Sequence, residues 1–162
     1  MRPLHGIKFE KAMFEIRPAN WKDCKLIWEW RNDEVTRKYS FNTKFIPFEE
    51  HQSWFKRVLQ DKNKIILIVL KGTIPVGVVR FDIEQENQVA EININIAPRK
   101  RGKGIGSSSI KIGCQYVFHQ LKLTKIIAKI KKENISSIKA FSKVGFSMLK
   151  ANNCTIIMKL IK

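Results

Sequence analysis

Residues 91–109 read EININIAPRKRGKGIGSSS and decide the fold that we expect for the whole chain. Ile92, Ile94 and Ile96 alternate with polar residues, which is the period of two of a strand with one apolar face. Pro98 has no backbone N–H for a strand ladder, so the strand is predicted to end before it. The segment is therefore predicted to begin as a half-buried strand that ends before Pro98.

A glycine-rich turn follows this strand. Gly102, Gly104 and Gly106 allow positive φ angles and a close approach of the backbone to a ligand. The helix expected after them would begin with free N–H groups and the positive end of its dipole. Arg101 and Lys103 add positive charge. These features together predict a cradle for a phosphate or pyrophosphate.

Three phosphate-binding motifs can be compared with this turn. The nucleoside-triphosphate loop, GxxxxGK[ST], is absent from it. The dinucleotide motif GxGxxG is nearly present, but Ser107 replaces its third glycine and no acidic residue follows about 20 residues later. The third motif, RxxGxG, is complete at Arg101, Gly104 and Gly106. Because this motif is short, a simple turn before an ordinary helix remains the alternative.

Composition favours one globular domain over residues 1–162, with 1–12 as a loose N-terminal extension. The chain is 44% hydrophobic and 28% charged, and it lacks both the apolar run of about 20 residues that a membrane span needs and a signal-peptide core. Cys24, Cys114 and Cys154 have no metal-ligand spacing, so we expect buried thiols, no metal and a reducing cytoplasm.

The formal net charge of +17 is the unusual quantity in the composition. It indicates acidic partners such as phosphates, nucleotides or nucleic acid. The lysines are dispersed, however, and no predicted helix carries a basic face interleaved with aromatic residues. We therefore expect no nucleic-acid partner, and a basic nucleic-acid-binding module remains the non-enzyme alternative.

The remaining sequence alternates between strands and helices. Asn20 with Asp23 three residues later predicts a helix start, and Gly145 suits the end of the last helix. Arg31 and Asn32 are polar residues at a helix end, where side chains often face a site. Predicted strands span 14–17, 64–70, 74–83, 91–96, 125–130, 146–149 and 154–160; predicted helices span 20–30, 48–60, 105–121 and 133–144, with a loop or broken helix over 35–47.

Two segments resemble the GNAT acyltransferase superfamily. The first is the RxxGxG turn; the second has Asn134 and Ser137 in an NxxS pattern, followed by AFSKVGF over 140–146. The element order after Met13 is similar to the whole GNAT fold. The resemblance implies an α+β fold: a mostly antiparallel central sheet of about six to seven strands with splayed fourth and fifth strands, flanked by about four helices.

The resemblance also implies that acetyl-CoA binds between the splayed strands as the acetyl donor. Its pantetheine arm would pair with the fourth strand, and its pyrophosphate would bind the glycine-rich turn. The residues implied are Ile94, Asn95 and Ile96 for the arm, Arg101, Gly102, Lys103, Gly104, Ile105, Gly106 and Ser107 for the pyrophosphate, and Asn134, Ser137 and Phe141 on the other wall.

Chemistry on an amine requires a base, and Glu91 on the polar side of the strand is the candidate. The alternative is that Glu91 is an exposed strand residue paired with a lysine or arginine. Phe141 stands where many relatives have a tyrosine that protonates the leaving thiolate. The acid would then be Tyr39, His51 or water, although a single histidine here is more often a surface or capping residue.

Segments 30–37 (WRNDEVTR), 40–42 (SFN) and 49–55 (EEHQSWF) resemble one GNAT branch in particular. That branch acetylates the 4-amino group of nucleotide-linked deoxy amino sugars, as in pseudaminic acid biosynthesis. The resemblance implies acceptor contacts from Arg31, Asn32, His51 and Arg80, and we expect Arg31, Arg80 and nearby lysines to receive the diphosphate. A protein N-terminus, as in ribosomal-protein acetyltransferases, or a small amine is the alternative acceptor. We expect a monomer or homodimer.

Overall fold

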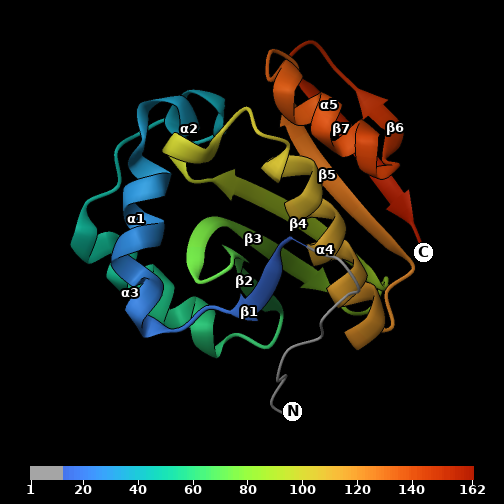
Figure 1. The fold of residues 1–162 in the computed structure, drawn as a ribbon. Helices are drawn as coiled ribbons and strands as arrows, with labels where there is room; N and C mark the ends of the chain where they lie inside the picture. Colours follow the sequence, from blue (N-terminus) through green and yellow to red (C-terminus); the bar gives the residue numbers. More distant parts are fainter. Residues whose placement is uncertain (1–12) are drawn as a thin grey trace.

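The strands of the computed structural model, which describes residues 13–162, join one seven-stranded sheet in the order β1-β2-β3-β4-β5-β7-β6 (Figure 1). Every neighbouring pair is antiparallel except β4 and β5. The predicted extension, 1–12, lies outside the described residues. The strands are β1 Glu15–Pro18, β2 Lys64–Lys71, β3 Ile74–Glu84, β4 Val89–Ile96, β5 Lys125–Lys131, β6 Ser147–Ala151 and β7 Thr155–Ile161.

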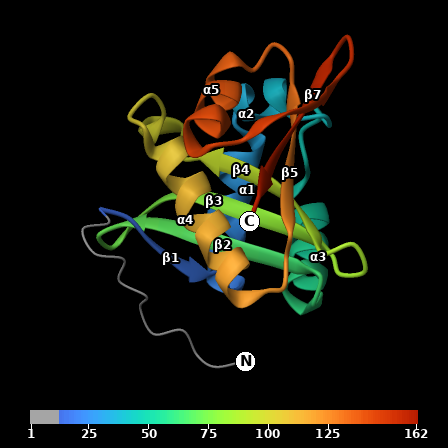
Figure 2. The same cartoon turned by 90° about the vertical axis from the view of Figure 1, so that its right-hand side faces the viewer.

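The helices cover both faces of this sheet (Figure 2). On one face lie α1 (Cys24–Asn32), α2 (Glu34–Tyr39) and α3 (Phe48–Gln60); on the other lie α4 (Ile105–Gln120) and α5 (Ile135–Val144). The mostly antiparallel α+β fold is thereby confirmed. The expected number of about four helices omitted α2, which occupies the first part of the segment predicted as a loop or broken helix.

Each face of the sheet has its own hydrophobic core. Beneath α4 the core includes Phe81 and Val117, and beneath α1 and α3 it includes Phe55 and Ile68. Alternation along the strands explains the division, because successive side chains point to opposite faces. Gly113 lets α4 approach closely, since a Cβ atom there would lie 3.1 Å from Val79 Cγ1.

Local capping rules set the start of α1 and the end of α5. Asn20 and Asp23 form a reciprocal capping box on the 3-10 turn Trp21–Asp23 that leads into α1. The carboxylate of Asp23 also accepts two hydrogen bonds of 2.8 Å from Arg17 on β1. At the other end, Gly145 has φ of +111°, as predicted for a residue that ends a helix in the left-handed region.

The parallel strands β4 and β5 part soon after they meet. They pair only where Val89–Glu91 faces Lys125–Ile127, although both strands continue beyond this point. The predicted splay of the fourth and fifth strands is therefore confirmed. The other edge of β4 stays paired with β3 as far as Ile96, so the splay opens one edge of β4 only.

The prediction about the cysteines has a mixed outcome. Cys24 and Cys114 are buried thiols as expected, but Cys154 is exposed in the turn between β6 and β7, so the expectation of three buried cysteines is wrong there. No helix among residues 13–162 is long and apolar enough to cross a membrane. The same residues contain no cluster of three or more metal-binding side chains.

Candidate active site

A cleft of about 940 Å³ occupies the wedge between β4 and β5 and extends over the face that carries α1 to α3. It brings together residues from both halves of the chain. Among the predicted site residues, the cleft is lined by Arg31, His51, Arg80, Glu91, Ile94, Asn95, Ile96, Arg101, Gly102, Gly104, Ile105, Gly106, Ser107, Asn134, Ser137 and Phe141. Asn32 and Lys103 lie outside this lining, as far as residues 13–162 form it.

The glycine-rich turn has the geometry of a phosphate cradle. Gly104 is the N-cap residue of α4 with φ of +73°, and Gly102 has φ of +74°. A Cβ atom on either glycine would meet no other heavy atom of the described chain within 4 Å, so both face open space. No side chain of the described residues caps α4. Its first N–H groups and its dipole are therefore available to an anion, which fits the diphosphate of acetyl-CoA.

The second half of β4 fits the rest of that molecule. Beyond Glu91 its edge toward β5 is unpaired within the described chain, so an amide-rich arm could pair there as an added strand. Asn134 caps α5 by accepting from Ser137 N, and both residues line the far wall of the cleft. When bound, acetyl-CoA supplies the thioester carbonyl that an amine attacks.

Phe141 does not supply an acid. Its ring is buried in the core and packs edge-on against Phe146, with the ring centroids 4.9 Å apart. A phenylalanine ring has no hydroxyl, so protonation of a leaving thiolate requires another group at this place. Tyr39 at the end of α2 also lines the cleft and carries a hydroxyl, which keeps it among the predicted candidates.

Glu91 lines the cleft at the point where β4 and β5 separate. Its Oε2 lies 2.9 Å from Lys129 Nζ on β5, so the carboxylate is held as an ion pair. The two alternatives predicted for Glu91 are therefore compatible: its carboxylate pairs with a lysine, and the residue also lines the cleft. A carboxylate that lines the cleft is suited to accept a proton, and the role of Glu91 as base stays a prediction.

His51 differs from its predicted surface or capping position. Its ring is buried, stacks on Phe55, and has Nε2 3.0 Å from the carbonyl oxygen of Cys24. Burial lowers the pKa of His51 from its ordinary value; the Cys24 carbonyl works in the opposite direction, and the Arg31 charge lowers it further. The ring therefore fixes α3 against α1 in its neutral form near pH 7, while one side lines the cleft.

Asn32 has a structural task that was not predicted. Its side-chain amide donates to the carbonyl of Ile46 at 2.9 Å and accepts from the N–H of the same residue at 2.8 Å. These paired bonds fix the loop before α3. The side chain thus shapes the cleft indirectly through the loop, and its role as an acceptor contact stays a prediction.

Three arginines gather on the acceptor side, and one of them was not predicted. Arg31 donates to the carbonyl of Asn42 at 2.7 Å through Nη2, but its Nη1 is buried without a partner among the described residues. The same holds for Nε of Arg80 and of Arg37 within 13–162. Burial lowers the pKa of Arg31, and the positive charges of Arg80 and Arg37 lower it further. Arg80 also pairs with Asp82 at 3.4 Å through Nη2. Half-buried cations that repel each other and keep buried N–H groups without partners are suited to bind an anion.

Other residues near the cleft also escaped the sequence analysis. The indole ring of Trp54 lies 5.8 Å from the guanidinium carbon of Arg80 and helps to orient it. Asp33 and Thr36 contact Arg101 across the cleft. A sequence signal existed for Asp33, because Asp33 followed by Thr36 is a capping pattern for α2.

The family model described as "Acetyltransferase (GNAT) domain" matches residues 14–147, and the chain therefore belongs to the GNAT acetyltransferase family. It is 26% identical over 135 residues to spermidine N(1)-acetyltransferase of Escherichia coli K12, covering 83% of this chain and 73% of the relative. It is 27% identical over 129 residues to acetyltransferase PseH of Campylobacter jejuni strain 81-176, covering 80% of each.

A crystal structure of spermidine N-acetyltransferase from Vibrio cholerae, in complex with CoA and spermine, has the same fold with a TM-score of 0.85. It is 22% identical and the alignment covers 92% of this chain and 95% of that one. The protein is thus an enzyme, an N-acetyltransferase that uses acetyl-CoA as acetyl donor and an amine as acceptor. The prediction of an acetyltransferase is therefore confirmed, and it is preferred to the alternative of a nucleic-acid-binding module.

Proposed function

We propose that the acceptor is an amine that carries phosphate, with the 4-amino group of a nucleotide-linked deoxy amino sugar as the best candidate. The supporting observation is the arginine group formed by Arg31, Arg37 and Arg80. Two of its buried N–H groups, on Arg31 and Arg80, belong to residues that line the cleft and have no partner among residues 13–162. A diphosphate supplies oxygen acceptors and negative charge for such donors.

Small-amine acetylation is the second candidate, because relatives of similar identity are named for spermidine. Charge weighs against a polyamine in this cleft. A polyamine is a polycation near pH 7, and the arginines would repel it in a partly desolvated site. Only Glu50 and Glu91 contribute carboxylates to the described lining, and Glu91 already pairs with Lys129. A PseH-like acceptor is consistent with this charge distribution.

The proposal assigns separate tasks to the chain's own residues. Glu91 accepts a proton from the acceptor ammonium, directly or through water, so that a neutral amine attacks. The arginine group holds the phosphate end of the acceptor and thereby aligns its amino group. The glycine turn and the open edge of β4 hold acetyl-CoA.

The test measures CoA release from acetyl-CoA with three acceptors: a UDP-linked 4-amino-4,6-dideoxysugar, the same amino sugar without the nucleotide, and spermidine. We expect kcat/KM for the UDP-linked sugar to exceed that for the other two by about two orders of magnitude, since each charge-assisted contact contributes about 1.5–3 kcal/mol. Preference for spermidine, or equal turnover of the sugar without nucleotide, would refute the proposal.

Variants locate the phosphate site. Arg31→Gln and Arg80→Gln should each raise KM for the UDP-linked sugar about tenfold or more without changing the Kd of acetyl-CoA. Lys56→Gln is the matched control, because it removes the same charge from the exposed surface of α3. An equal change in KM for all three variants would mean that general charge, rather than this site, attracts the acceptor.

A further inference from the structure

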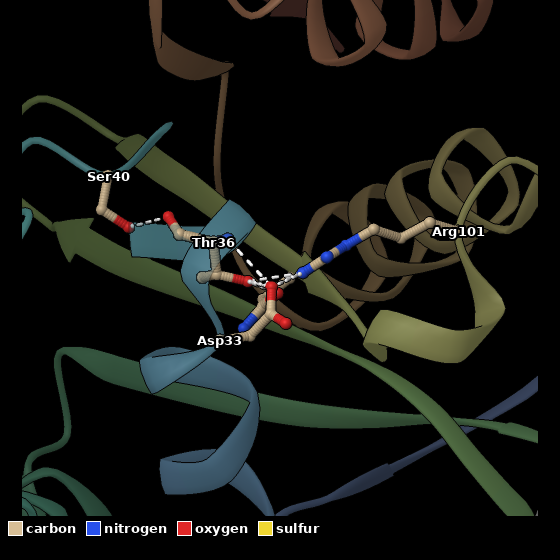
Figure 3. Close-up of polar contacts among 5 residues, drawn as sticks. Asp33, Thr36, Ser40 and Arg101 are labelled. Carbon is tan, nitrogen blue, oxygen red and sulfur yellow. Dashed lines mark hydrogen bonds and ion pairs between the residues drawn. The ribbon is translucent and has the colours of Figure 1, made fainter. Parts of the chain in front are cut away.

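The arginine of the RxxGxG turn, Arg101, extends to α2, where its guanidinium meets Asp33 and Thr36 (Figure 3). Arg101 Nη2 donates to Asp33 Oδ2 at 2.7 Å and to Thr36 Oγ1 at 2.7 Å. Asp33 lies 68 residues earlier in the chain. This contact therefore joins the turn that is expected to hold acetyl-CoA to the acceptor half.

Asp33 has two tasks in this contact. It is the N-cap residue of α2 and accepts from Thr36 N at 3.1 Å, while the same oxygen pairs with Arg101. Burial would raise the pKa of Asp33, but the hydrogen bond from Arg101 and the N–H of Thr36 outweigh it and hold the pKa below its ordinary value. The carboxylate is consequently charged at neutral pH and its ion pair with Arg101 is intact.

Helix α2 has no buried side chain, so polar contacts contribute much to its position. The helix has six residues, and none of them is buried in the described structure. Such a short helix is not stable by itself. Besides the Asp33 contact, Thr36 Oγ1 lies 3.1 Å from Asn95 Oδ1 on β4, and Lys131 Nζ on β5 donates to the carbonyl of Lys38 at 2.9 Å. Helix α2 thus spans the splayed strands.

The position of α2 decides the shape of the acceptor side. Thr36 and Tyr39 of α2 line the cleft, and so do Ser40, Phe41 and Asn42 directly after it. Asn42 in turn accepts the hydrogen bond from Arg31. A displacement of α2 would therefore move the wall that faces the acceptor as well as the loop that orients Arg31.

We propose that Asp33 is a positioning residue that couples the two substrates. Through Arg101 it holds α2 against the glycine turn, and with α2 it holds the acceptor wall, meaning Thr36, Tyr39 and residues 40–42. Acetyl-CoA bound at the turn therefore stabilises the acceptor wall. Ordering of the turn by the diphosphate fixes Arg101, and Arg101 fixes α2. By linkage, an acceptor that orders α2 strengthens acetyl-CoA binding by the same factor. The coupling is independent of which amine is acetylated.

Substitution by asparagine separates the two tasks of Asp33. Asparagine caps helices as well as aspartate does, so Asp33→Asn keeps the α2 cap and removes the ion pair with Arg101. Glu34→Gln is the matched control: it makes the same chemical change one residue later, at an exposed side chain that has no ion pair within the described chain.

The measurement is hydrogen exchange of the backbone amides of α2, with and without saturating acetyl-CoA. In the native enzyme and in Glu34→Gln we expect acetyl-CoA to slow this exchange about fivefold or more. In Asp33→Asn the slowing should disappear although acetyl-CoA still binds. Arg101→Gln breaks the same ion pair from the other side and should lose the slowing too, and Arg101→Lys should restore part of it.

The comparison with and without acetyl-CoA distinguishes coupling from a purely structural role. If Asp33 only stabilised α2, the substitution would speed exchange equally in both conditions and the ratio would stay unchanged. That result would overturn the proposal, as would an absence of slowing in the native enzyme. Because this hydrogen-exchange measurement needs no acceptor, its result tests the coupling independently of the proposed amino-sugar substrate.

Discussion

Gly104 allows the most direct test of the acetyl-CoA site. Glutamate at this position should weaken acetyl-CoA binding by about two orders of magnitude, because its carboxylate would stand at the start of α4 where we expect the diphosphate. At a separation of about 5 Å and an effective dielectric constant of about 20, one charge opposes another by about 3 kcal/mol, which is a factor of about 150 in Kd.

Glutamine at the same position isolates the charge. Both variants force an L-residue into φ of +73°, which costs about 1–2 kcal/mol and lowers Tm by a few degrees in each. Both side chains start into open space, since a Cβ atom at residue 104 meets no other heavy atom of the described chain within 4 Å. Strain and bulk therefore cancel between the two variants, and the difference in Kd reports the charge.

Isothermal titration of acetyl-CoA at low and at high salt is the assay. We expect Gly104→Gln to bind acetyl-CoA within about tenfold of the native enzyme and Gly104→Glu to bind far more weakly, with the gap narrowing at high salt because ions screen the carboxylate. Equal Kd values for the two variants would show that no negative group of acetyl-CoA lies at the start of α4, and the assignment of the turn would be wrong.

Two further predictions concern the base and the stability of the N-terminal half. Glu91→Gln should lower kcat about 10²- to 10⁴-fold and leave the Kd of acetyl-CoA unchanged, as measured by CoA release and titration; an unchanged kcat would remove Glu91 as the base. Asp23→Asn should lower the free energy of unfolding near pH 7 by about 1–3 kcal/mol, because Arg17 loses its charged partner. Burial raises the pKa of Asp23, but the hydrogen bonds from Arg17 and Asn20 outweigh burial and hold this pKa below its ordinary value. The stabilisation therefore exists above the unfolded-state pKa and is lost as pH falls through the folded-state pKa. In denaturant titrations the gap in free energy between native and variant protein should therefore begin to narrow below about pH 4 and keep narrowing as pH falls; a gap that does not narrow there would contradict this linkage.

Much of the fold could be predicted because its signals are local. The helix over Phe48–Gln60 was expected with the bounds that it has, and the capping asparagines at 20 and 134 lie where helices begin. The end of the last helix at Gly145 needed only the rule that a left-handed residue favours glycine. Each of these features depends on residues a few positions apart.

The pairings of charged residues could not be predicted in the same way. Arg101 with Asp33, and Glu91 with Lys129, join residues that lie far apart in the chain and meet only because the sheet and helices place them together. The burial of His51 was not predicted, because no nearby residue in the sequence indicates that the Cys24 carbonyl lies within hydrogen-bonding distance of ring Nε2. Most of the predicted site residues therefore line the cleft, but the partners that fix each side chain were not predicted.

Sequence identity alone does not choose the acceptor, because the relatives named for spermidine and for PseH are 26% and 27% identical to this chain. The physical distinction lies in the face of the sheet that carries α1 to α3. A polyamine ammonium placed about 5 Å from one arginine at an effective dielectric constant of about 20 is opposed by about 3 kcal/mol. Arg31 and Arg80 both line the cleft, and Asp82, 3.4 Å from Arg80, offsets part of the charge of Arg80 only. A phosphate in the same place gains that interaction instead of losing it, and it fills donors that otherwise stay buried without a partner among residues 13–162. The charge of the acceptor wall, more than overall similarity, therefore supports a phosphate-bearing amine.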